Sequence, residues 1–254
     1  MADCSVLVCS CDKYEEVWGP FFKLFFKYQN NLSFPVFLLT EKKVYQSEKV
    51  VSIPETGDWS NRLIAALNKI QSKYVVLLLD DFFMMKPIRA DEIYRVIGIM
   101  DSNPNIAAFY FKRSTPQINQ HIEYGEYVKM DKSKKYIINF QAGLWEKEAL
   151  KKILKPHLSP WDIEEKNCLE IDSNYNFYCT AKSSFFECEN DVFPYLWAIA
   201  SGYGVCKSKW LWNNKKLFKK EGIPFKPKQL PVMSKFEFLK NKIVAKIKRI
   251  LKNA

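Results

Sequence analysis

The sequence predicts an α/β fold in which a mostly parallel sheet is flanked by helices. The first observation is the apolar run at residues 74–79, which contains two valines and ends at Asp80 and Asp81. Such a short apolar run is typical of a strand buried on both faces, as in a parallel sheet. The second observation is that apolar runs alternate with segments of helical periodicity. This β-α-β order with short connections favours right-handed crossovers between parallel strands.

The part of the chain before Asp80 is expected to contain two helices and three further strands, at residues 5–9, 35–39 and 49–53. Gly19 and Pro20 are expected to open the first helix, because proline fits the first helical position. Its apolar residues lie nearly all round, which indicates a helix packed inside the core. Asp58 or Ser60 is expected to cap the second helix, which runs to Lys73.

The part of the chain after Asp81 continues the alternation. We expect helices at residues 91–100 and 146–154, strands at residues 106–111 and 137–145, and a helical turn or two at residues 194–201. Residues 112–136 are polar, basic and weakly patterned, which indicates an excursion with short strands. Residues 207–231 are rich in Lys and Pro and lack periodicity, which indicates a linker or a surface wrap.

Length and composition favour one large domain with a short appendage. The chain has 254 residues, 48% hydrophobic and 15% aromatic, which supports a substantial core and argues against disorder. We place the domain at residues 1–225 and a tail at residues 226–254. The seven Cys include no C-x-x-C pair, and His121 and His157 are isolated, so reduced thiols are favoured over a zinc site. No signal peptide and no apolar run of roughly 20 residues are found, so we expect a cytoplasmic location.

The net charge of +11 is compatible with nucleic acid, an anionic membrane surface or phosphorylated small molecules. More than half of it lies in residues 234–254, where seven basic residues stand against Glu237. One helical stripe there is apolar: Phe236, Leu239, Ile243, Val244, Ile247, Ile250 and Leu251. This pattern is typical of an interfacial helix on an anionic bilayer, at the inner face of the cell membrane. The alternative is a terminal helix docked on the domain with its basic face in water.

Asp80 and Asp81 are the first candidate site. Ligands of parallel sheets bind outside the carboxyl ends of the strands, where these acids are expected. Buried charges need compensation, which a divalent cation carrying a nucleotide diphosphate would give. Neighbouring side chains of an extended chain point to opposite faces, so both acids can hold one ion only if the chain turns there. The alternative is a surface turn, in which Asp is common.

Two further segments have candidate ligand-binding residues. Residues 10–14 follow the first strand with small and polar groups that suit a nucleotide or phosphate, or they form an ordinary polar loop. Trp161 lies beside Asp162, Glu164 and Glu165. An aromatic face beside carboxylates suits a sugar. The same acids also suit the first turn of a capped helix, and both interpretations stay open.

These residues together resemble the small bacterial glycosyltransferases with a GT-A-type, Rossmann-like fold that build capsule, O-antigen or other surface polysaccharides. The resemblance spans roughly residues 5–225. It rests on the order and spacing of segments 8–14, 34–41, 59–63, 78–83, 141–145 and 160–164. This chain departs from the family's Asp-x-Asp motif, because its two acids are adjacent and Leu79 precedes them.

The resemblance implies a hexosyltransferase-type enzyme with a nucleotide-sugar donor of the UDP class and a saccharide or polyprenyl-diphosphate-linked acceptor. It implies that Mn²⁺ or Mg²⁺ is held by Asp80 and Asp81. It implies contact with the donor for Ser10, Asp12, Lys13, Thr40, Glu41, Asn61, Arg62, Asp80, Gln141 and Gly143. It implies contact with the acceptor for Trp145 and Trp161.

An inverting transfer needs one carboxylate to accept the proton of the attacking hydroxyl. Asp162 is the first choice for this base and Glu164 the second. The rival hypothesis is a non-catalytic basic protein that binds membranes or nucleic acid, although no nucleic-acid motif is found. A metal-dependent phosphate-ester hydrolase is a third hypothesis, which the scarcity of His disfavours.

Overall fold

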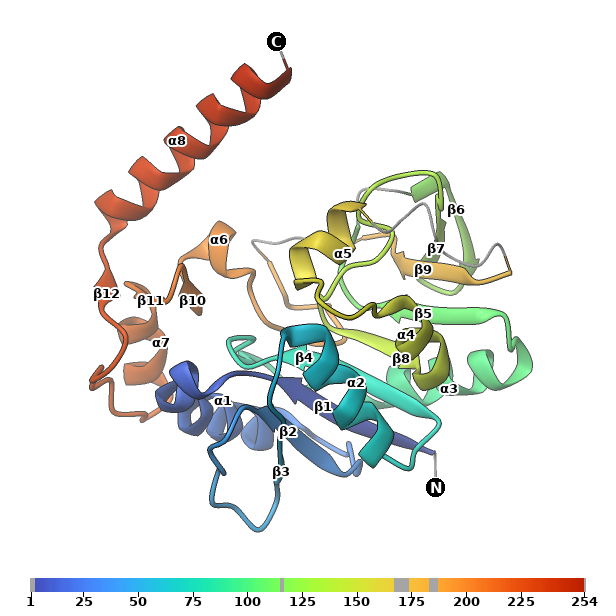
Figure 1. Cartoon of the computed structure of the whole chain (residues 1–254), viewed down its shortest axis with the longest axis horizontal. Coiled ribbons are helices and arrows are strands. Elements are labelled where there is room, and N and C mark those ends of the chain that lie inside the picture. The colour runs from blue at the N-terminus through green and yellow to red at the C-terminus, as the bar shows by residue number, and fades with distance from the viewer. Residues whose placement is uncertain (1–2, 115–116, 167–173, 183–186, 254) are drawn as a thin grey trace.

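The computed structural model describes residues 3–114, 117–166, 174–182 and 187–253, and it is built around one large sheet (Figure 1). The strands of this sheet run in the order β3-β2-β1-β4-β8-β5-β9-β7-β6. Their bounds are β1 Cys4–Cys9, β2 Val36–Thr40, β3 Val51–Pro54, β4 Tyr74–Leu79, β5 Ile106–Tyr110, β6 Gln117–Tyr124, β7 Tyr127–Met130, β8 Gly143–Glu146 and β9 Asn176–Thr180.

The first half of the sheet is parallel, as the sequence predicts. Strand β1 pairs in parallel with β2 and with β4, and β2 pairs in parallel with β3. Strand β8 then lies antiparallel between β4 and β5, with Leu144 opposite Val76 on one side and Phe109 on the other. Strand β9 continues in parallel beside β5. The sheet is therefore mixed, and the insertion of β8 joins its two halves.

Helices cover both faces of the sheet, which confirms the predicted α/β class. Their bounds are α1 Glu15–Tyr28, α2 Trp59–Lys69, α3 Ala90–Ser102, α4 Lys147–Ile153, α5 Pro160–Lys166, α6 Ala198–Ser201, α7 Asn214–Lys220 and α8 Lys235–Asn253. Strand β4 shows how the core divides. Val76 and Leu78 join the cluster with α1, α3 and α7, whereas Val75 and Leu77 join the cluster with α2, α4 and α5. Alternate side chains of one strand thus serve two apolar layers.

Three predicted boundaries were wrong, and the first is the end of α2, which lies at Lys69 and not at Lys73. Helix α1 begins at Glu15, directly after the short 3-10 helix Asp12–Tyr14, and Pro20 lies inside it. The chain at residues 137–142 is not a strand, although most of it is buried, and β8 begins only at Gly143. Backbone that is buried beside a sheet carries the same apolar residues as a strand, so the sequence pattern does not separate the two.

Residues 207–231 are not a linker, which corrects the prediction made for this Lys-rich stretch. They contain β11 (Lys209–Leu211), which pairs with β10 (Val205–Cys206) and β12 (Val232–Met233), and they contain helix α7. The side chains of Trp210, Leu217 and Phe218 are buried in the main core. This small sheet and α7 lie beside α1 at one end of the molecule (Figure 1).

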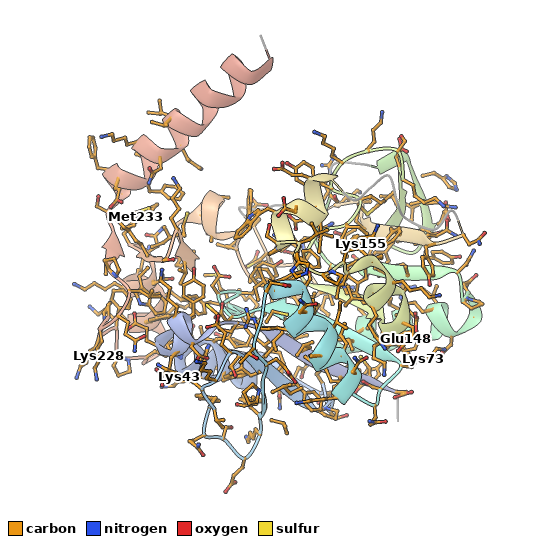
Figure 2. The ribbon with its side chains drawn as sticks, viewed as in Figure 1. Lys43, Lys73, Glu148, Lys155, Lys228 and Met233 are labelled. Atoms are coloured by element: carbon orange, nitrogen blue, oxygen red, sulfur yellow. The ribbon has the colours of Figure 1, made fainter. Side chains whose placement is uncertain are left out.

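Helix α8 projects from this small sheet, away from the rest of the molecule (Figure 1). Its first turn is docked, because Phe238 is buried against Leu211 and Met233, and Met233 lies at the base of the helix (Figure 2). Further apolar side chains of α8 are exposed: Phe236 by 80%, Leu239 by 46%, Ile243 by 61% and Val244 by 43%. The side chains of Ile247, Ile250 and Leu251 lie outside the described part. The tail boundary at residue 226 stays a prediction.

Candidate active site at the carboxyl ends of β1 and β4

The strand order reverses between β1 and β4, and a ligand crevice is expected outside the carboxyl ends of these two strands. The chain connects β1 to β2 on one side, while β4 pairs with β1 on the other side. Open α/β sheets bind ligands at such a reversal of strand order, outside the carboxyl ends of the strands. Cys9 is opposite Leu79 in the β1–β4 pair. Ser10 and Asp80 therefore emerge side by side at this point.

Asp80 is held in a buried hydrogen-bond network at the mouth of the crevice. Its side chain is 5% exposed and accepts a hydrogen bond from the Ser10 hydroxyl. Trp18 in α1 donates from Nε1 to the Ser10 oxygen at 2.6 Å, and Arg62 in α2 donates from Nη1 to the Ser10 carbonyl at 3.1 Å. Burial and the neighbouring Asp81 raise the pKa of Asp80 well above its ordinary value.

Asp81 lies in a turn that follows β4 directly. The Phe82 N–H donates to the Leu79 carbonyl at 3.2 Å and the Phe83 N–H to the Asp81 carbonyl at 3.0 Å. The chain thus turns at the two carboxylates, as binding of one ion by both would require. Asp81 Oδ2 accepts the backbone N–H of Val205 at 3.0 Å, and burial raises the pKa of Asp81 to about 6.

The chemistry of this acid pair suits a divalent cation. No Lys or Arg of the described chain is among the groups that shift the pKa of Asp80 or Asp81. A buried and a half-buried carboxylate without a positive partner are costly when both are ionised, and a cation would compensate them. No cluster of three or more His, Cys, Asp or Glu suited to a metal occurs among the described residues. Asp80 and Asp81 would hold such a cation together with phosphate and water oxygens, as Mg²⁺ commonly requires.

Gly204 lies against Asp81 and was not among the predicted site residues. It has a φ of +83°, and a Cβ there would lie 2.9 Å from Asp81 Oδ2 and 3.1 Å from the Asp81 carbonyl oxygen. The segment that carries it also brings Tyr14 close, because the Tyr14 hydroxyl lies 3.4 Å from Ser208 Oγ. The closely spaced glycines at positions 202 and 204 are the signal in the sequence that could have indicated this close approach.

Asp12 and Glu41 form a clamp between two loops of the site. The Asp12 carboxylate accepts the backbone N–H groups of Glu41, Lys42 and Lys43 at 3.0–3.2 Å. Glu41 in turn accepts the Asp12 N–H at 3.1 Å. Although burial opposes the change, these backbone hydrogen bonds lower the pKa of Asp12. Both carboxylates thus shape the loops.

Two residues beside these loops differ in exposure. Thr40 is fully buried and donates to the Lys43 carbonyl at 2.6 Å, so the structure corrects its predicted contact with the donor. Lys13 is exposed beside the site, and its role stays a prediction.

The first turn of α2 contacts two parts of the candidate site, the loop after β1 and the segment that precedes β8. Asp58 caps the helix as predicted, because its side chain accepts the Asn61 N–H at 2.9 Å. The Asn61 side chain donates back to Asp58 at 2.7 Å, so it serves this cap. Arg62 contacts the Ser10 carbonyl, as described above. The Trp59 ring packs edge-on against Phe140, with ring centroids 4.7 Å apart.

Gly143 and Trp145 do not line the crevice, which corrects their predicted roles. Gly143 lies within β8, and a Cβ there would lie 3.1 Å from the Phe109 carbonyl oxygen. Trp145 is 0% exposed and packs in the core beside Phe140, so its ring cannot contact an acceptor. Gln141 precedes β8 and is partly exposed. Gln141, Gly143 and Trp145 are neighbours in the sequence. Only the strand pairing shows that Gly143 and Trp145 are buried in β8 while Gln141 is partly exposed.

Helix α5 combines a capped start with a half-buried acid. Asp162 Oδ2 accepts from the Ser159 hydroxyl at 2.6 Å, and the Asp162 N–H donates back to Ser159 Oγ at 3.2 Å, a reciprocal cap. Glu164 Oε1 accepts the Phe140 N–H at 2.8 Å, and burial raises the pKa of Glu164. Trp161 is 71% exposed. The capped helix start is thus confirmed, whereas sugar binding by this segment stays a prediction.

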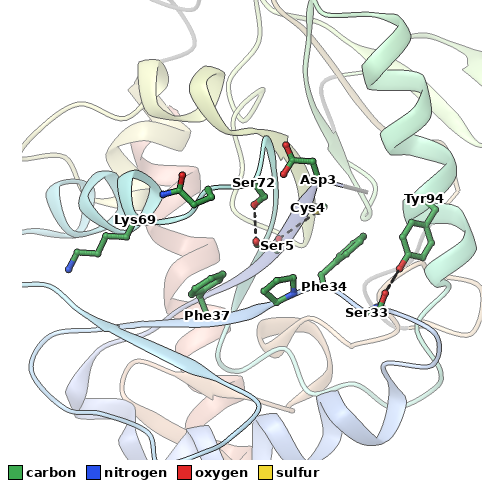
Figure 3. Close-up of a pocket in the computed structure, with 11 residues that line it drawn as sticks. Asp3, Cys4, Ser5, Ser33, Phe34, Phe37, Lys69, Ser72 and Tyr94 are labelled. Atoms are coloured by element: carbon green, nitrogen blue, oxygen red, sulfur yellow. Dashed lines mark hydrogen bonds between the residues drawn. The ribbon is translucent and has the colours of Figure 1, made fainter. Parts of the chain in front are cut away.

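A groove of about 400 Å³ opens at the other end of the sheet, at the amino ends of β1 and β4 (Figure 3). Two hydrogen bonds border it, from the Ser72 hydroxyl to the Ser5 oxygen at 2.8 Å and between the Ser33 and Tyr94 hydroxyls at 3.1 Å. Ligands of open α/β sheets bind at the opposite edge, so the acid pair remains the candidate active site.

No protein-family model and no curated protein sequence matches this chain. Among solved structures, it is similar to S. aureus TarS residues 1–349 in complex with UDP, at 12% identity and a TM-score of 0.47, with 72% of this chain and 59% of that chain covered. A putative nucleotide-diphospho-sugar transferase from Desulfovibrio desulfuricans G20 matches at 9% identity and a TM-score of 0.41, with 67% and 75% covered. A cytidylyltransferase from Leptospira borgpetersenii matches at 10% identity and a TM-score of 0.39, with 65% and 68% covered.

Proposed function

We propose that this chain is a glycosyltransferase that moves a sugar from a nucleotide-sugar donor, of the UDP class, to a saccharide or lipid-linked acceptor in bacterial surface polysaccharide synthesis. The observation that carries the proposal is the uncompensated acid pair Asp80–Asp81 at the point where the strand order reverses. This is where an α/β sheet binds a nucleotide, and a cation between carboxylates and a diphosphate would neutralise both.

The transfer proposed here is inverting. The acceptor hydroxyl oxygen forms a bond to the anomeric carbon while the bond from that carbon to the β-phosphate oxygen breaks. The nucleoside diphosphate leaves with the electron pair, and a carboxylate takes the hydroxyl proton. Mn²⁺ or Mg²⁺ bound by Asp80 and Asp81 would neutralise the charge that develops on the diphosphate.

Glu164 is the better supported base, ahead of Asp162. Burial raises the pKa of Glu164 towards the range in which a carboxylate accepts a proton efficiently. Its hydrogen bond to the Phe140 N–H fixes it beside the segment that leads to Gln141 and β8. Asp162, in contrast, caps its own helix through Ser159. The exposed ring of Trp161 on the same helix is the proposed acceptor platform.

The test is nucleotide binding, measured by calorimetry and thermal shift. Wild type is titrated with UDP-, GDP-, CMP- and dTDP-sugars, with and without Mn²⁺ or Mg²⁺. The double variant Asp80→Asn, Asp81→Asn is expected to lose the cation-dependent response. The matched control is Asp101→Asn, which alters an acid paired with Lys73 at the opposite end of β4. A wild type that responds to no nucleotide would contradict the proposal.

We further propose that α8 holds the enzyme on an anionic membrane surface. The support is its exposed apolar stripe, its projection from the body, and the net charge of +6 at residues 234–254. No described helix is long and apolar enough to cross a bilayer. A basic residue near an anionic surface contributes roughly 1 kcal/mol. An interfacial helix would therefore combine charge with apolar insertion.

Co-sedimentation with vesicles tests this second proposal. Vesicles that contain phosphatidylglycerol are expected to bind the full chain more strongly than phosphatidylcholine vesicles, in a salt-dependent way. The variant Phe236→Ser, Ile243→Ser removes apolar side chains and keeps every charge, and it is expected to weaken binding. Retention of this variant on the vesicles, or preferential binding to a DNA duplex, would favour a purely electrostatic role.

A further inference from the structure

A buried ion pair between Lys112 and Asp191 fixes the segment at residues 191–195. Lys112 is 1% exposed and donates to the carboxylate of Asp191, which is 6% exposed. Lys112 also donates to the Tyr195 carbonyl at 2.8 Å, and its ammonium lies 4.7 Å from the centroid of the Tyr195 ring. Buried ion pairs contribute little net stability. This pair does hold Tyr195 at both its backbone and its ring.

Tyr195 is fixed on its other side by the turn that carries the acids. Its ring stacks on Phe82, the residue after Asp81, with centroids 4.1 Å apart and an angle of 7° between the planes. The side chain is 0% exposed. The position of the phenol oxygen is therefore set by two rigid contacts.

The Tyr195 hydroxyl determines which way the Gln141 amide points. The hydroxyl oxygen accepts the Ala142 backbone N–H at 3.2 Å and lies 2.7 Å from Gln141 Oε1. A phenol is protonated at neutral pH and has one hydrogen to donate. Gln141 Oε1 is the acceptor for it. The amide oxygen of Gln141 is thus engaged, and its NH₂ group is the end that can bind a ligand.

Gln141 lies near the turn that carries the acid pair. It accepts a hydrogen bond from the Tyr195 hydroxyl, and the Tyr195 ring stacks on Phe82, the residue after Asp81. Gly143, two residues further along the chain, is opposite Leu77 of β4. Gln141 is partly exposed, whereas Ala142 and Tyr195 behind it are buried. We infer that Tyr195 is a positioning residue which orients Gln141 so that its amide NH₂ donates a hydrogen bond to the sugar of the bound donor.

This inference rests on the proposed function and adds a substrate property to it. An amide NH₂ donates and cannot accept. The donor sugar must therefore present an acceptor at this point, such as a hydroxyl oxygen or the carbonyl of an N-acyl group. The acid pair contacts the diphosphate, whereas Gln141 contacts the sugar, so the two contributions can be separated by ligands that differ only in the sugar.

The experiment compares binding of UDP with binding of UDP-sugar, each with Mn²⁺, by calorimetry. The variants are Tyr195→Phe, which keeps the stacked ring, and Gln141→Ala. Each is expected to weaken binding of UDP-sugar by about five- to tenfold, the usual worth of one hydrogen bond, and to leave UDP binding within about twofold. The double variant is expected to match Gln141→Ala alone, because Tyr195 acts through Gln141. Tyr45→Phe is the matched control, since it removes a partly buried hydroxyl away from Gln141.

Each outcome has one meaning. Equal loss of UDP and UDP-sugar, additive effects in the double variant, or no effect of Gln141→Ala would overturn the role of Tyr195 while the proposed function stands. A wild type that binds neither ligand would overturn both. Thermal unfolding of every variant checks the fold, and the surface variant Gln141→Ala keeps the inference falsifiable if Tyr195→Phe does not fold.

Discussion

Gly204 combines a positive φ with a close approach to Asp81. A comparison with Gly222 allows the effect of each on stability and binding to be measured separately. Both Gly204 and Gly222 have positive φ, but a Cβ at Gly222 would have nothing within 4 Å, whereas at Gly204 it would meet Asp81. We expect Gly204→Ala and Gly222→Ala each to lose about 1–2 kcal/mol of unfolding free energy, from the backbone alone. Urea denaturation measures this loss.

Only Gly204→Ala is also expected to weaken cation-dependent nucleotide binding, because its methyl group displaces Asp81. A loss of about tenfold in affinity corresponds to about 1.4 kcal/mol. If Gly222→Ala weakened binding equally, the effect would come from backbone strain and not from contact with Asp81.

Removal of one partner of the Lys112–Asp191 pair is expected to cost far more unfolding free energy than removal of one partner of an exposed ion pair. Lys112→Met leaves a buried carboxylate without its partner, which costs about 3–5 kcal/mol. Lys86 pairs with Glu189, and these side chains are 50% and 77% exposed. Lys86→Met is therefore expected to cost less than about 1 kcal/mol. Equal losses in denaturant unfolding of the two variants would show that Lys112 is solvated.

Helix α5 is the element where pH dependence is expected, through Glu164. Burial raises its pKa in the folded state. Its contribution to stability is therefore present below the unfolded pKa of about 4.3 and is lost as the pH rises through the folded pKa. Activity has the opposite dependence, because the base must be ionised, so kcat/KM falls as the pH drops through the same pKa.

The variant Glu164→Gln is expected to abolish transfer and to remove this pH-dependent loss of stability. Glu165→Gln is the control, since Glu165 is the next residue and is exposed. Rate profiles and thermal unfolding between about pH 4 and pH 8 measure both effects. An unchanged acidic limb in Glu164→Gln would favour Asp162 as the base.

The elements themselves were largely readable from the sequence, with informative exceptions. The Asp58 cap, the apolar faces of α2 and α3, and strands β1, β2, β4 and β5 follow from local periodicity and capping chemistry. Of the strand predicted at residues 137–145, only the part in β8 is a strand. Residues 137–142 are mostly apolar because they are buried beside the sheet, not because they belong to it. Strands β9 to β12 were not predicted. Strand β9 pairs with the distant strands β5 and β7, and β10, β11 and β12 have only two or three residues each, too few for a local pattern.

At the scale of the whole molecule, the C-terminal region is part of the fold up to the first turn of α8. Glu16 in α1 accepts the backbone N–H groups of Lys228, Gln229 and Leu230 at 2.8–2.9 Å. Leu230, Met233 and Phe238 are buried. A chain that ends at residue 225 is expected to lose about 5 kcal/mol of stability, given about 1.5–3 kcal/mol for each buried apolar side chain.

A chain that ends at residue 241 is the matched comparison and is expected to unfold near the wild-type temperature. It keeps the docked turn and lacks most of the projecting helix. If ending the chain at residue 225 left the unfolding temperature unchanged, the tail would begin where the sequence pattern places it, at residue 226.

The sequence by itself determined the α/β class, the buried strand that delivers Asp80 and Asp81, and the amphipathic character of the last helix. These follow from the order of apolar and polar residues along short segments. The tertiary structure decided which candidates meet at the crevice. Trp145 and Thr40 are buried in the core, and Asp12 and Glu41 hold two loops together. Gly204 and Tyr195, which the sequence did not indicate, lie beside the turn that carries the acids. The physical reason is that side-chain burial depends on the pairing of strands distant in sequence, which local periodicity does not encode.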